Sequence, residues 1–337
     1  MVKMKDVTID LVKLYNFRIH EGYKLKLNQK ITSILGENGC GKTSVLEAIY
    51  IALQGKSFRA VDREILRRES EYYKIEVVFS SGEKVVVSYD GQKKTFLVQD
   101  KKCVRLPRKN KYPVVLFLPE DLHLVASSPT SKREYFDRFL VQLDESYSSN
   151  LSKYNKALKQ RNELLKQDGV DAQQLFSWDI LLSNYGVAIR KKREELISGI
   201  NKEFTKVYRG IAENDDLVEI KYKSYTGDVL ESEYVRLLNL DFSRDVLTGH
   251  TNFGVHKDDF EFIFNGSDAE GSASRGELRS MILALKFIEA KILERVNGRK
   301  PIVMLDDVFS ELDKNRRKSL MKNFQENQII LTSVEKV

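Results

Sequence analysis

The sequence contains one loop whose residue types and spacing could hold a phosphate. GENGCGKTS, from Gly36 to Ser44, contains the pattern G-x-x-x-x-G-K-T. Glycines at this spacing let the backbone turn tightly and point its N–H groups inward, Lys42 can reach β- and γ-phosphates, and the Thr43 hydroxyl can bind Mg²⁺. The whole loop is therefore expected to bind a nucleotide. Its residues are Gly36, Glu37, Asn38, Gly39, Cys40, Gly41, Lys42, Thr43 and Ser44.

A phosphate loop needs a strand before it and a helix after it. Residues 30–35 (KITSIL) are short, β-branched and apolar at their end, which is typical of a strand. Apolar residues then recur at helical spacing from Val45 to Leu53. A helix N-terminus at this point carries about half a positive charge, which favours an anion. The flanking elements favour phosphate binding over a chance glycine-rich turn.

A second pair of candidate groups follows a buried strand near the end of the sequence. PIVMLDDVFSELD has four apolar residues, from Ile302 to Leu305, and then Asp306 and Asp307. Open α/β sheets bind ligands at the carboxyl ends of their strands. Asp306 is expected to hold Mg²⁺ through water, and Asp307 to orient or deprotonate the attacking water. The plainer alternative is an acid that caps the end of a strand.

A third candidate lies at the start of a long amphipathic helix. Ser274, Arg275 and Gly276 open the stretch SRGELRSMILALKF. Ser274 and Glu277 also form a capping box, so a purely structural role fits the same residues. A serine hydroxyl and glycine amide at a helix N-terminus can bind an anion. Because the chain encodes one phosphate loop, we expect this second site to meet the γ-phosphate held by another copy in an ATP-dependent homodimer.

Composition narrows the class of protein. The chain has 337 residues, is 42% hydrophobic and 31% charged, and has no apolar run of the roughly 18 residues that a membrane span needs. No signal-peptide core is apparent. Cys40 and Cys103 cannot make a disulfide framework, and oxidation of Cys40 would obstruct the loop. We expect a globular cytoplasmic protein without a membrane partner.

The net charge of +7 is unevenly distributed. Residues 1–125 hold 23 basic and 15 acidic residues, and residues 93–111 alone hold eight basic residues against one acid. A charge run is usually a solvated face, but an excess concentrated in one part of the chain favours a nucleic-acid partner. The stretch Arg190–Arg193, in the expected helical arm, is a second choice for this surface. The expected DNA-binding residues are Arg59, Arg63, Lys101, Lys102, Arg105, Arg108 and Lys109.

The pattern along the chain predicts two regions. Residues 1–125 read mainly as strands around the phosphate-loop helix, including a strand within residues 1–17, hairpins over residues 73–98 and an apolar strand that ends at Pro119. Residues 126–235 read as helical, and strand–helix alternation returns after residue 245. The predicted organisation is a phosphate-binding head, residues 1–125 and 245–337, interrupted by a helical arm at 126–244.

Together these motifs resemble the ABC-type ATPases that act on DNA, the family of the SMC proteins and RecF, and they are most similar to its RecF branch. The similarity also covers SFR at Ser57–Arg59, FLPEDLHLVASSPTSKREYFDRFL, YNKALKQRN at Tyr154–Asn162 and GVHKDDF at Gly254–Phe260. The resemblance implies an α/β ABC-type ATPase head, with a P-loop core and an antiparallel β subdomain, and a helical insert. It identifies Ser274–Gly276 as the signature motif, Asp306 and Asp307 as the Walker B pair, and Ser310–Asp313 as the D-loop.

The resemblance also implies a function. It implies ATP and Mg²⁺ as ligands, binding to gapped or single-strand/double-strand junction DNA in recombinational repair, and RecO and RecR as partners in loading recombinase. This sequence has Asp307 where transporter-type ATPases use Glu, and Pro119-Glu120-Asp121 where they place Gln. Glu120 is therefore a second catalytic candidate beside Asp307. We expect a weak, DNA-stimulated ATPase in which hydrolysis acts as a timer.

Three other classes fit less well. A transporter ATPase would need a coupling surface for a membrane partner, and an SMC protein would need a far longer coiled coil than residues 126–244 supply. An SMC-like or defence-system ATPase acting on DNA with a different partner remains the alternative, although a defence-system ATPase would be expected to carry a nuclease domain beside its head. His250 and His256 lie near Asp258 and Asp259, but the spacing is not that of a metal site, and a structural or nucleotide-adjacent loop is preferred.

Overall fold

The computed structural model describes residues 7–334, and all elements and counts below refer to that range. The chain divides into two compact units, Met1–Leu122 with Lys286–Val337, and His123–Leu285. The second boundary lies at 285/286, inside a helix, rather than at 244/245, because strands on either side of residue 245 pair with each other. The expected strand over residues 1–17 is present from Ile9, and its first six residues lie outside the described range.

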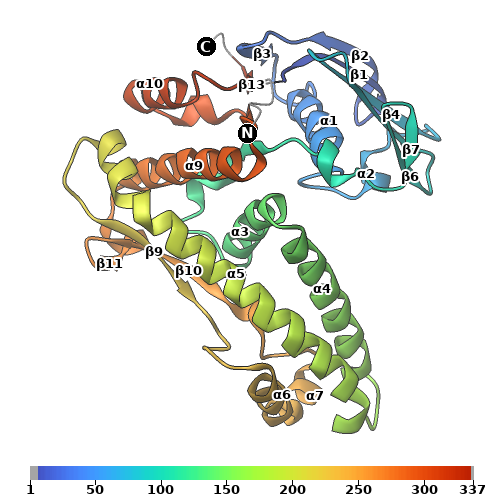
Figure 1. Ribbon diagram of the computed structural model, residues 1–337, viewed down its shortest axis with the longest axis vertical. Helices are drawn as coiled ribbons and strands as arrows, with labels where there is room; N and C mark the ends of the chain where they lie inside the picture. Colours follow the sequence, from blue (N-terminus) through green and yellow to red (C-terminus); the bar gives the residue numbers. More distant parts are fainter. Residues whose placement is uncertain (1–6, 335–337) are drawn as a thin grey trace. The chain divides into compact units, whose positions relative to one another are not determined.

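The first unit contains a six-stranded antiparallel sheet in the order β2-β1-β4-β5-β6-β7 (Figure 1). Its strands alternate buried and exposed side chains, as the sequence pattern predicts. The hairpins expected over residues 73–98 are present. The strands are β1 (Ile9–Phe17), β2 (His20–Lys26), β4 (Tyr73–Phe79), β5 (Lys84–Tyr89), β6 (Lys94–Val98) and β7 (Lys101–Cys103).

A second, parallel sheet of the same unit has the order β3-β13-β12-β8. Its register places Leu305 beside Phe117 and Leu331, and Leu35 beside Ser333. The carboxyl ends of these strands therefore lie along one edge, where the phosphate loop and the aspartate pair both begin. The strands are β3 (Ile31–Leu35), β8 (Val114–Phe117), β12 (Ile302–Leu305) and β13 (Ile329–Ser333).

Helix α1 (Lys42–Gln54) is the centre of the first unit. It contacts β1, β4 and β5 of the antiparallel sheet and β8 and β13 of the parallel sheet, and one hydrophobic core joins all of them. Nearly every residue of α1 is buried, so the helix is held rigidly where the phosphate loop ends. The remaining elements of this unit are α2 (Asp62–Ile65), η1 (Arg108–Asn110), η2 (Pro119–His123), η4 (Val308–Glu311) and α10 (Lys314–Asn323).

The second unit is built on three helices, α3 (Pro129–Leu143), α4 (Glu145–Leu165) and α5 (Ala172–Ala212). Side chains cap the N-termini of all three, including a complete capping box at Asp171 and Gln174 of α5. The prediction of continuous helix to residue 235 is wrong at β9 (Val218–Lys223). After α5 ends at Glu213 in the left-handed conformation, this segment pairs with β10 (Asp259–Phe264), a contact that local periodicity does not encode.

The other elements of this unit complete a three-stranded sheet, β11-β10-β9, and its flanking helices. Helix α9 begins in this unit and ends in the first. No helix within residues 7–334 is long and apolar enough to cross a membrane. The elements are α6 (Glu231–Leu240), α7 (Phe242–Thr248), η3 (Val255–Lys257), β11 (Ser267–Asp268), α8 (Ala269–Ser272) and α9 (Arg275–Asn297).

Candidate nucleotide site

The phosphate loop connects β3 to α1 as the sequence predicts. Gly41 caps α1 with φ 93°, a left-handed conformation that favours glycine. A Cβ on Gly41 would also lie 2.6 Å from His20 Nε2, so the loop is closely packed on that side. Residues Glu37, Asn38, Gly39 and Cys40 are exposed, whereas Lys42 and Ser44 are buried. The middle of the loop is therefore accessible to a ligand, while its end is anchored by the buried first residues of α1.

Lys42 is directed back over the loop. Its side chain is only 4% exposed, and its Nζ donates hydrogen bonds to the carbonyls of Gly36 at 2.8 Å and Glu37 at 3.1 Å. The same ammonium lies 3.8 Å from Asp307 Oδ2. One positive charge is thus held between the loop and the aspartate pair, where the β- and γ-phosphates of a bound nucleotide would place negative charge.

Thr43 and Asp306 form the part of the site suited to a divalent cation. The Thr43 hydroxyl donates to Asp306 Oδ1 at 2.9 Å, and Thr332 donates to the same oxygen at 2.8 Å. Burial raises the pKa of Asp306, and the two hydroxyl hydrogen bonds offset this only in part. A hydroxyl and a carboxylate oxygen this close fit the oxygen ligands of Mg²⁺, whose charge would favour ionised Asp306. Thr332, at the end of β13, was not predicted as part of the site.

Asp307 is held in an unusual conformation. Its φ is 49°, and its N–H donates to the Thr332 hydroxyl at 2.8 Å. The Asp307 side chain is 32% exposed, yet its Oδ1 is buried and has no hydrogen-bond partner within the described residues. A carboxylate oxygen without a partner is a ready acceptor for a hydrogen bond from water, while the other oxygen, Oδ2, lies beside Lys42. The geometry favours Asp307 as the water-orienting group.

Glu120 and Asp121 have different surroundings. Asp121 is buried, accepts a hydrogen bond from the Leu118 N–H at 3.0 Å and pairs with Lys286 at 3.0 Å, so it is structural. Glu120 is exposed on η2, at the same edge of the sheet as Asp306. Within the described part of the chain, no hydrogen bond or ion pair joins Glu120 to the aspartate pair or to Lys42. Its predicted catalytic role therefore stays a second choice.

A buried carboxylate that the sequence analysis missed organises the helix side of the site. Glu47, on α1, is fully buried and accepts hydrogen bonds from Arg18 at 2.9 Å, from Arg59 at 2.9 and 3.1 Å and from Ser57 at 2.6 Å. Burial alone would raise the pKa of Glu47, but these hydrogen bonds outweigh it and the pKa is lowered. Arg59 Nη2 also lies 3.5 Å from the Ser44 hydroxyl. The position of Arg59 therefore favours a role at the nucleotide site over its predicted role in DNA binding.

The turn between β1 and β2 also lies against the loop. His20 Nε2 is 3.2 Å from the Gly41 carbonyl oxygen, and Ile19, at the tip of the turn, is exposed. Arg18 of the same turn supplies the hydrogen bonds to Glu47. The sequence contains no spacing signal that ties residues 18–20 to the loop, since the contact comes from strand pairing.

Comparison with known proteins agrees with this geometry. Residues 12–212 match the family model described as AAA domain. The chain is 32% identical over 333 residues to the DNA replication and repair protein RecF of Clostridium perfringens, a match that covers 96% of this chain and 92% of the relative. The chain belongs to the RecF family. It is also 35% identical over 339 residues to RecF of Natranaerobius thermophilus, covering 94% and 88%.

Solved structures of RecF have the same fold. The chain resembles the "recombination mediator protein RecF-ATPrS in RecFOR pathway" with a TM-score of 0.89 and 28% identity, over all of this chain and 95% of that one. It resembles the corresponding RecF-ATP structure with a TM-score of 0.87 and 29% identity, over 98% and 93%. An Smc head domain derived from Pyrococcus furiosus shares the fold at a TM-score of 0.50 and 12% identity, over 98% and 90%. The predicted ABC-type head of the RecF branch is confirmed.

The signature residues form the capping box that the sequence predicts. The Ser274 N–H donates to Glu277 Oε2 at 2.6 Å, and the Glu277 N–H donates to the Ser274 hydroxyl at 3.3 Å. Ser274 and Arg275 are exposed, and Gly276 is half-buried, at the first turn of α9 in the second unit. The structural role of this RecF motif is thus present, and its polar groups remain accessible.

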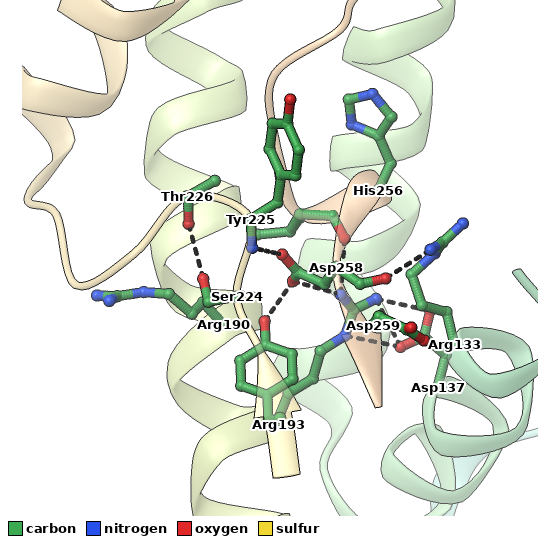
Figure 2. Close-up of polar contacts among 12 residues, drawn as sticks. Arg133, Asp137, Arg190, Arg193, Ser224, Tyr225, Thr226, His256, Asp258 and Asp259 are labelled. Atoms are coloured by element: carbon green, nitrogen blue, oxygen red, sulfur yellow. Dashed lines mark hydrogen bonds and ion pairs between the residues drawn. The ribbon is translucent and has the colours of Figure 1, made fainter. Parts of the chain in front are cut away.

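The RecF motif Gly254–Phe260 is part of a buried polar network within the second unit (Figure 2). Arg193 lies at its centre and donates to Asp258 and Asp137 at 2.9 Å and to the Val255 carbonyl at 2.8 Å. Burial raises the pKa of Asp258, although Arg193 lowers it in part. His256 bonds to Tyr154 at 2.8 Å and lies 3.0 Å from the Thr251 carbonyl. The structural interpretation of this histidine is thereby favoured.

The second unit corrects part of one expectation. The alternative DNA surface was Arg190–Arg193, but its two arginines are buried, and Arg190 donates to the Gly227 carbonyl and to Asp228 at 2.7 and 2.6 Å, whereas Lys191 is exposed and Lys192 half-buried. These arginines hold the second unit together and do not present charge to a partner. The other predicted DNA residues are exposed in the first unit, on α2, on β7 and its following loop, or on η1: Arg63, Lys101, Lys102, Arg105, Arg108 and Lys109.

Proposed function

We propose that this protein is an ATP-dependent DNA-binding protein of recombinational repair and replication restart. The observation that carries the proposal is the assembled arrangement of Lys42, Thr43, Asp306 and Asp307 at one edge of the parallel sheet, in a chain similar along nearly its whole length to RecF structures described with ATP. The substrates are ATP and water. The proposed DNA is gapped or carries a single-strand/double-strand junction.

In this proposal each residue of the site has one role. The loop N–H groups and Lys42 bind the β- and γ-phosphates, while Thr43 and Asp306 hold Mg²⁺, which neutralises phosphate charge when bound. Asp307 orients the attacking water with its buried, unpaired oxygen. Arg59, fixed by Glu47, adds a positive charge beside Ser44. Because Asp307 is a short carboxylate with one oxygen beside Lys42, we propose slow, DNA-stimulated hydrolysis that resets a switch.

The proposed switch is a homodimer. Ser274 and Arg275 are exposed at a helix N-terminus, where donors favour an anion. ATP would bring two copies together, with Ser274 of each at the γ-phosphate bound by the other. In that state the dimer would close on DNA and assist RecO and RecR in loading recombinase.

Sedimentation with ATP and Mg²⁺ tests the dimer. Ser274→Arg should bind ATP with unchanged affinity and remain a monomer. The substitution removes the hydroxyl that would meet the γ-phosphate and puts a larger side chain in its place. Ser272→Arg is the matched control, since Ser272 is also exposed, lies two residues earlier, and has a hydroxyl that donates to the Asp268 carbonyl. A Ser274→Arg dimer as stable as that of the wild type would show that the site does not act in trans.

The basic run on β7 and η1 is proposed to bind DNA phosphates. Such contacts carry no sequence information, so binding should be independent of sequence and fall by about 0.9 log unit per log unit of salt for each duplex phosphate neutralised. Reversal of Lys101, Lys102 and Arg105 to Glu should weaken binding to every sequence and flatten this salt dependence, while ATP binding is retained. If both the affinity and the slope persist, the run is a solvated face.

A further inference from the structure

The antiparallel sheet of the first unit has two faces of different character. Helix α1 lies against β1 and β4 (Figure 1) and contacts β5 as well. On the face that it covers, Val12, Leu14, Ile75 and Val77 are buried. On the other face the alternate side chains are exposed or half-buried, with Glu76 and Val86 as the buried exceptions. We name this second side the outer face and define it by the three cross-strand rows described next.

Strand register places a set of lysines on this outer face. One row runs Lys24, Lys13, Glu76, Val86, Leu97 and Lys102 across all six strands. The next rows are Lys26, Leu11, Val78 and Lys84, and Gly22, Tyr15, Lys74, Ser88 and Thr95. Within these rows Glu76 is the sole acid, and the lysines are Lys13, Lys24, Lys26, Lys74, Lys84 and Lys102.

Glu76 orders the lysines without covering them. Its carboxylate lies 2.6 Å from Lys74 Nζ, 3.1 Å from Lys84 Nζ and 3.7 Å from Lys13 Nζ. Their side chains are nevertheless 39%, 48% and 33% exposed. Burial alone would raise the pKa of Glu76, but its hydrogen bonds to Lys74 and Lys84 lower it. One ionised acid thus fixes three ammonium groups whose combined charge it only partly neutralises.

Stability alone does not account for this pattern. Lysines on edge strands protect a sheet from pairing with other chains, and this explains those of β2 and β7. The lysines on interior strands, Lys13, Lys74 and Lys84, pair instead with Glu76, whose single charge cannot neutralise all three. Lys13 and Lys24 also lie directly opposite each other, an arrangement that destabilises a sheet. A partner of opposite charge would offset that repulsion.

Aromatic side chains accompany the lysines. Tyr15 is exposed on the outer face, with Lys74 Nζ 5.6 Å from its ring centroid, and the adjoining Tyr72 is 51% exposed. Lys102 belongs both to this face and to the basic run, so the two surfaces are continuous. A hollow of about 340 Å³ lies on this face, lined by Lys84, Val86 and Leu97 of the rows and by Glu83 and Asp100 beside them. Because the two acids repel phosphate, the proposed phosphate-binding area excludes the hollow.

We propose that the outer face binds the phosphate backbone of duplex DNA, as an extension of the basic run. The proposal rests on the proposed DNA-binding function and names a surface for it. Lysines held at strand spacing by register and by Glu76 supply positive charge without base-reading geometry, and exposed tyrosine hydroxyls can donate to phosphate oxygens. Binding through this face is therefore independent of sequence and dependent on salt.

The test compares two double variants of equal charge. Lys24→Gln with Lys26→Gln alters the outer face on an edge strand, where both side chains are exposed. Lys318→Gln with Lys322→Gln alters exposed positions of α10 in the same unit. Fluorescence anisotropy is measured with ATP and Mg²⁺ on two duplexes of unrelated sequence, over about 50 to 200 mM salt.

The face variant should lower the salt slope by about 1.8, because two phosphate contacts are lost, and the control variant should retain the wild-type slope. A face variant whose salt slope equals that of the control overturns this proposal, and an acidic protein surface would then be the partner that fits the lysines. Duplex binding by the wild type would still support the proposed function. Absence of duplex binding by the wild type overturns both.

Discussion

Glu47→Gln is the substitution whose effect follows most directly from the structure. It keeps the shape of a fully buried side chain and removes the charge that neutralises Arg18 and Arg59. The new amide also turns one acceptor into a donor that faces N–H groups. Loss of one partner from a buried ion pair costs about 3–5 kcal/mol, and we expect the lower end, about 3 kcal/mol, because both arginines are partly exposed.

Thermal unfolding followed by circular dichroism measures this cost. For a unit of this size about 3 kcal/mol lowers Tm by roughly 6–12 °C. Glu64→Gln, at an exposed position on α2, is the control and should change stability by less than about 0.5 kcal/mol. Because the folded pKa of Glu47 is lowered, its stabilisation is present above the unfolded pKa near 4.5 and is lost as pH falls through the folded value. The stability of Glu47→Gln should therefore fall less than that of the wild type as the pH is lowered. A Tm within about 1 °C of wild type would refute the account of Glu47.

Three further substitutions test other parts of the structure. Lys42→Ala should weaken ATP binding by about 10- to 150-fold in isothermal titration, because a charge-assisted hydrogen bond contributes roughly 1.5–3 kcal/mol; unchanged affinity in a folded variant would contradict this. Asp307→Asn should bind ATP and lose turnover by at least about 100-fold, and a wild-type rate would point to Glu120 instead. Burial lowers the pKa of His256 from 6.5 to about 4, so its stabilisation is present above pH 6.5 and is lost as pH falls towards 4. Denaturant titrations at pH 7 and pH 5 should show that the free energy of unfolding falls by about 2 kcal/mol more for wild type than for His256→Gln. Equal decreases would show that His256 is not the source of this pH dependence.

The phosphate loop and the aspartate pair were predictable because each is a contiguous motif with its own strand. Their meeting also followed from sequence, since carboxyl ends of parallel strands share one edge. Glu47 was not predictable. It lies on a helix that reads as a buried amphipathic segment, and its partners Arg18 and Arg59 come from separate turns. The hydrogen bond from Thr332 to Asp306 was not predictable for the same reason, because it depends on the order of β12 and β13.

The second unit shows where local pattern fails. Val218–Lys223 alternates weakly after a helix of 41 residues, and its strand character comes from pairing with β10. Arg193 reads from sequence as one member of a charged helical face, whereas the fold buries it against Asp258. The lysines of the outer face illustrate the opposite case. Alternation indicates which side of a strand is exposed, but only the register brings Lys13 opposite Lys24.

The central claim is that ATP bound at the Lys42 site controls the affinity of the protein for DNA. An electrophoretic shift on gapped duplex DNA, with ATP and Mg²⁺, with ADP and without nucleotide, tests it most directly. The account predicts tighter binding with ATP than in the other two states, lost in Lys42→Ala and longer-lived in Asp307→Asn. Equal affinity in all three nucleotide states for the wild type would contradict it.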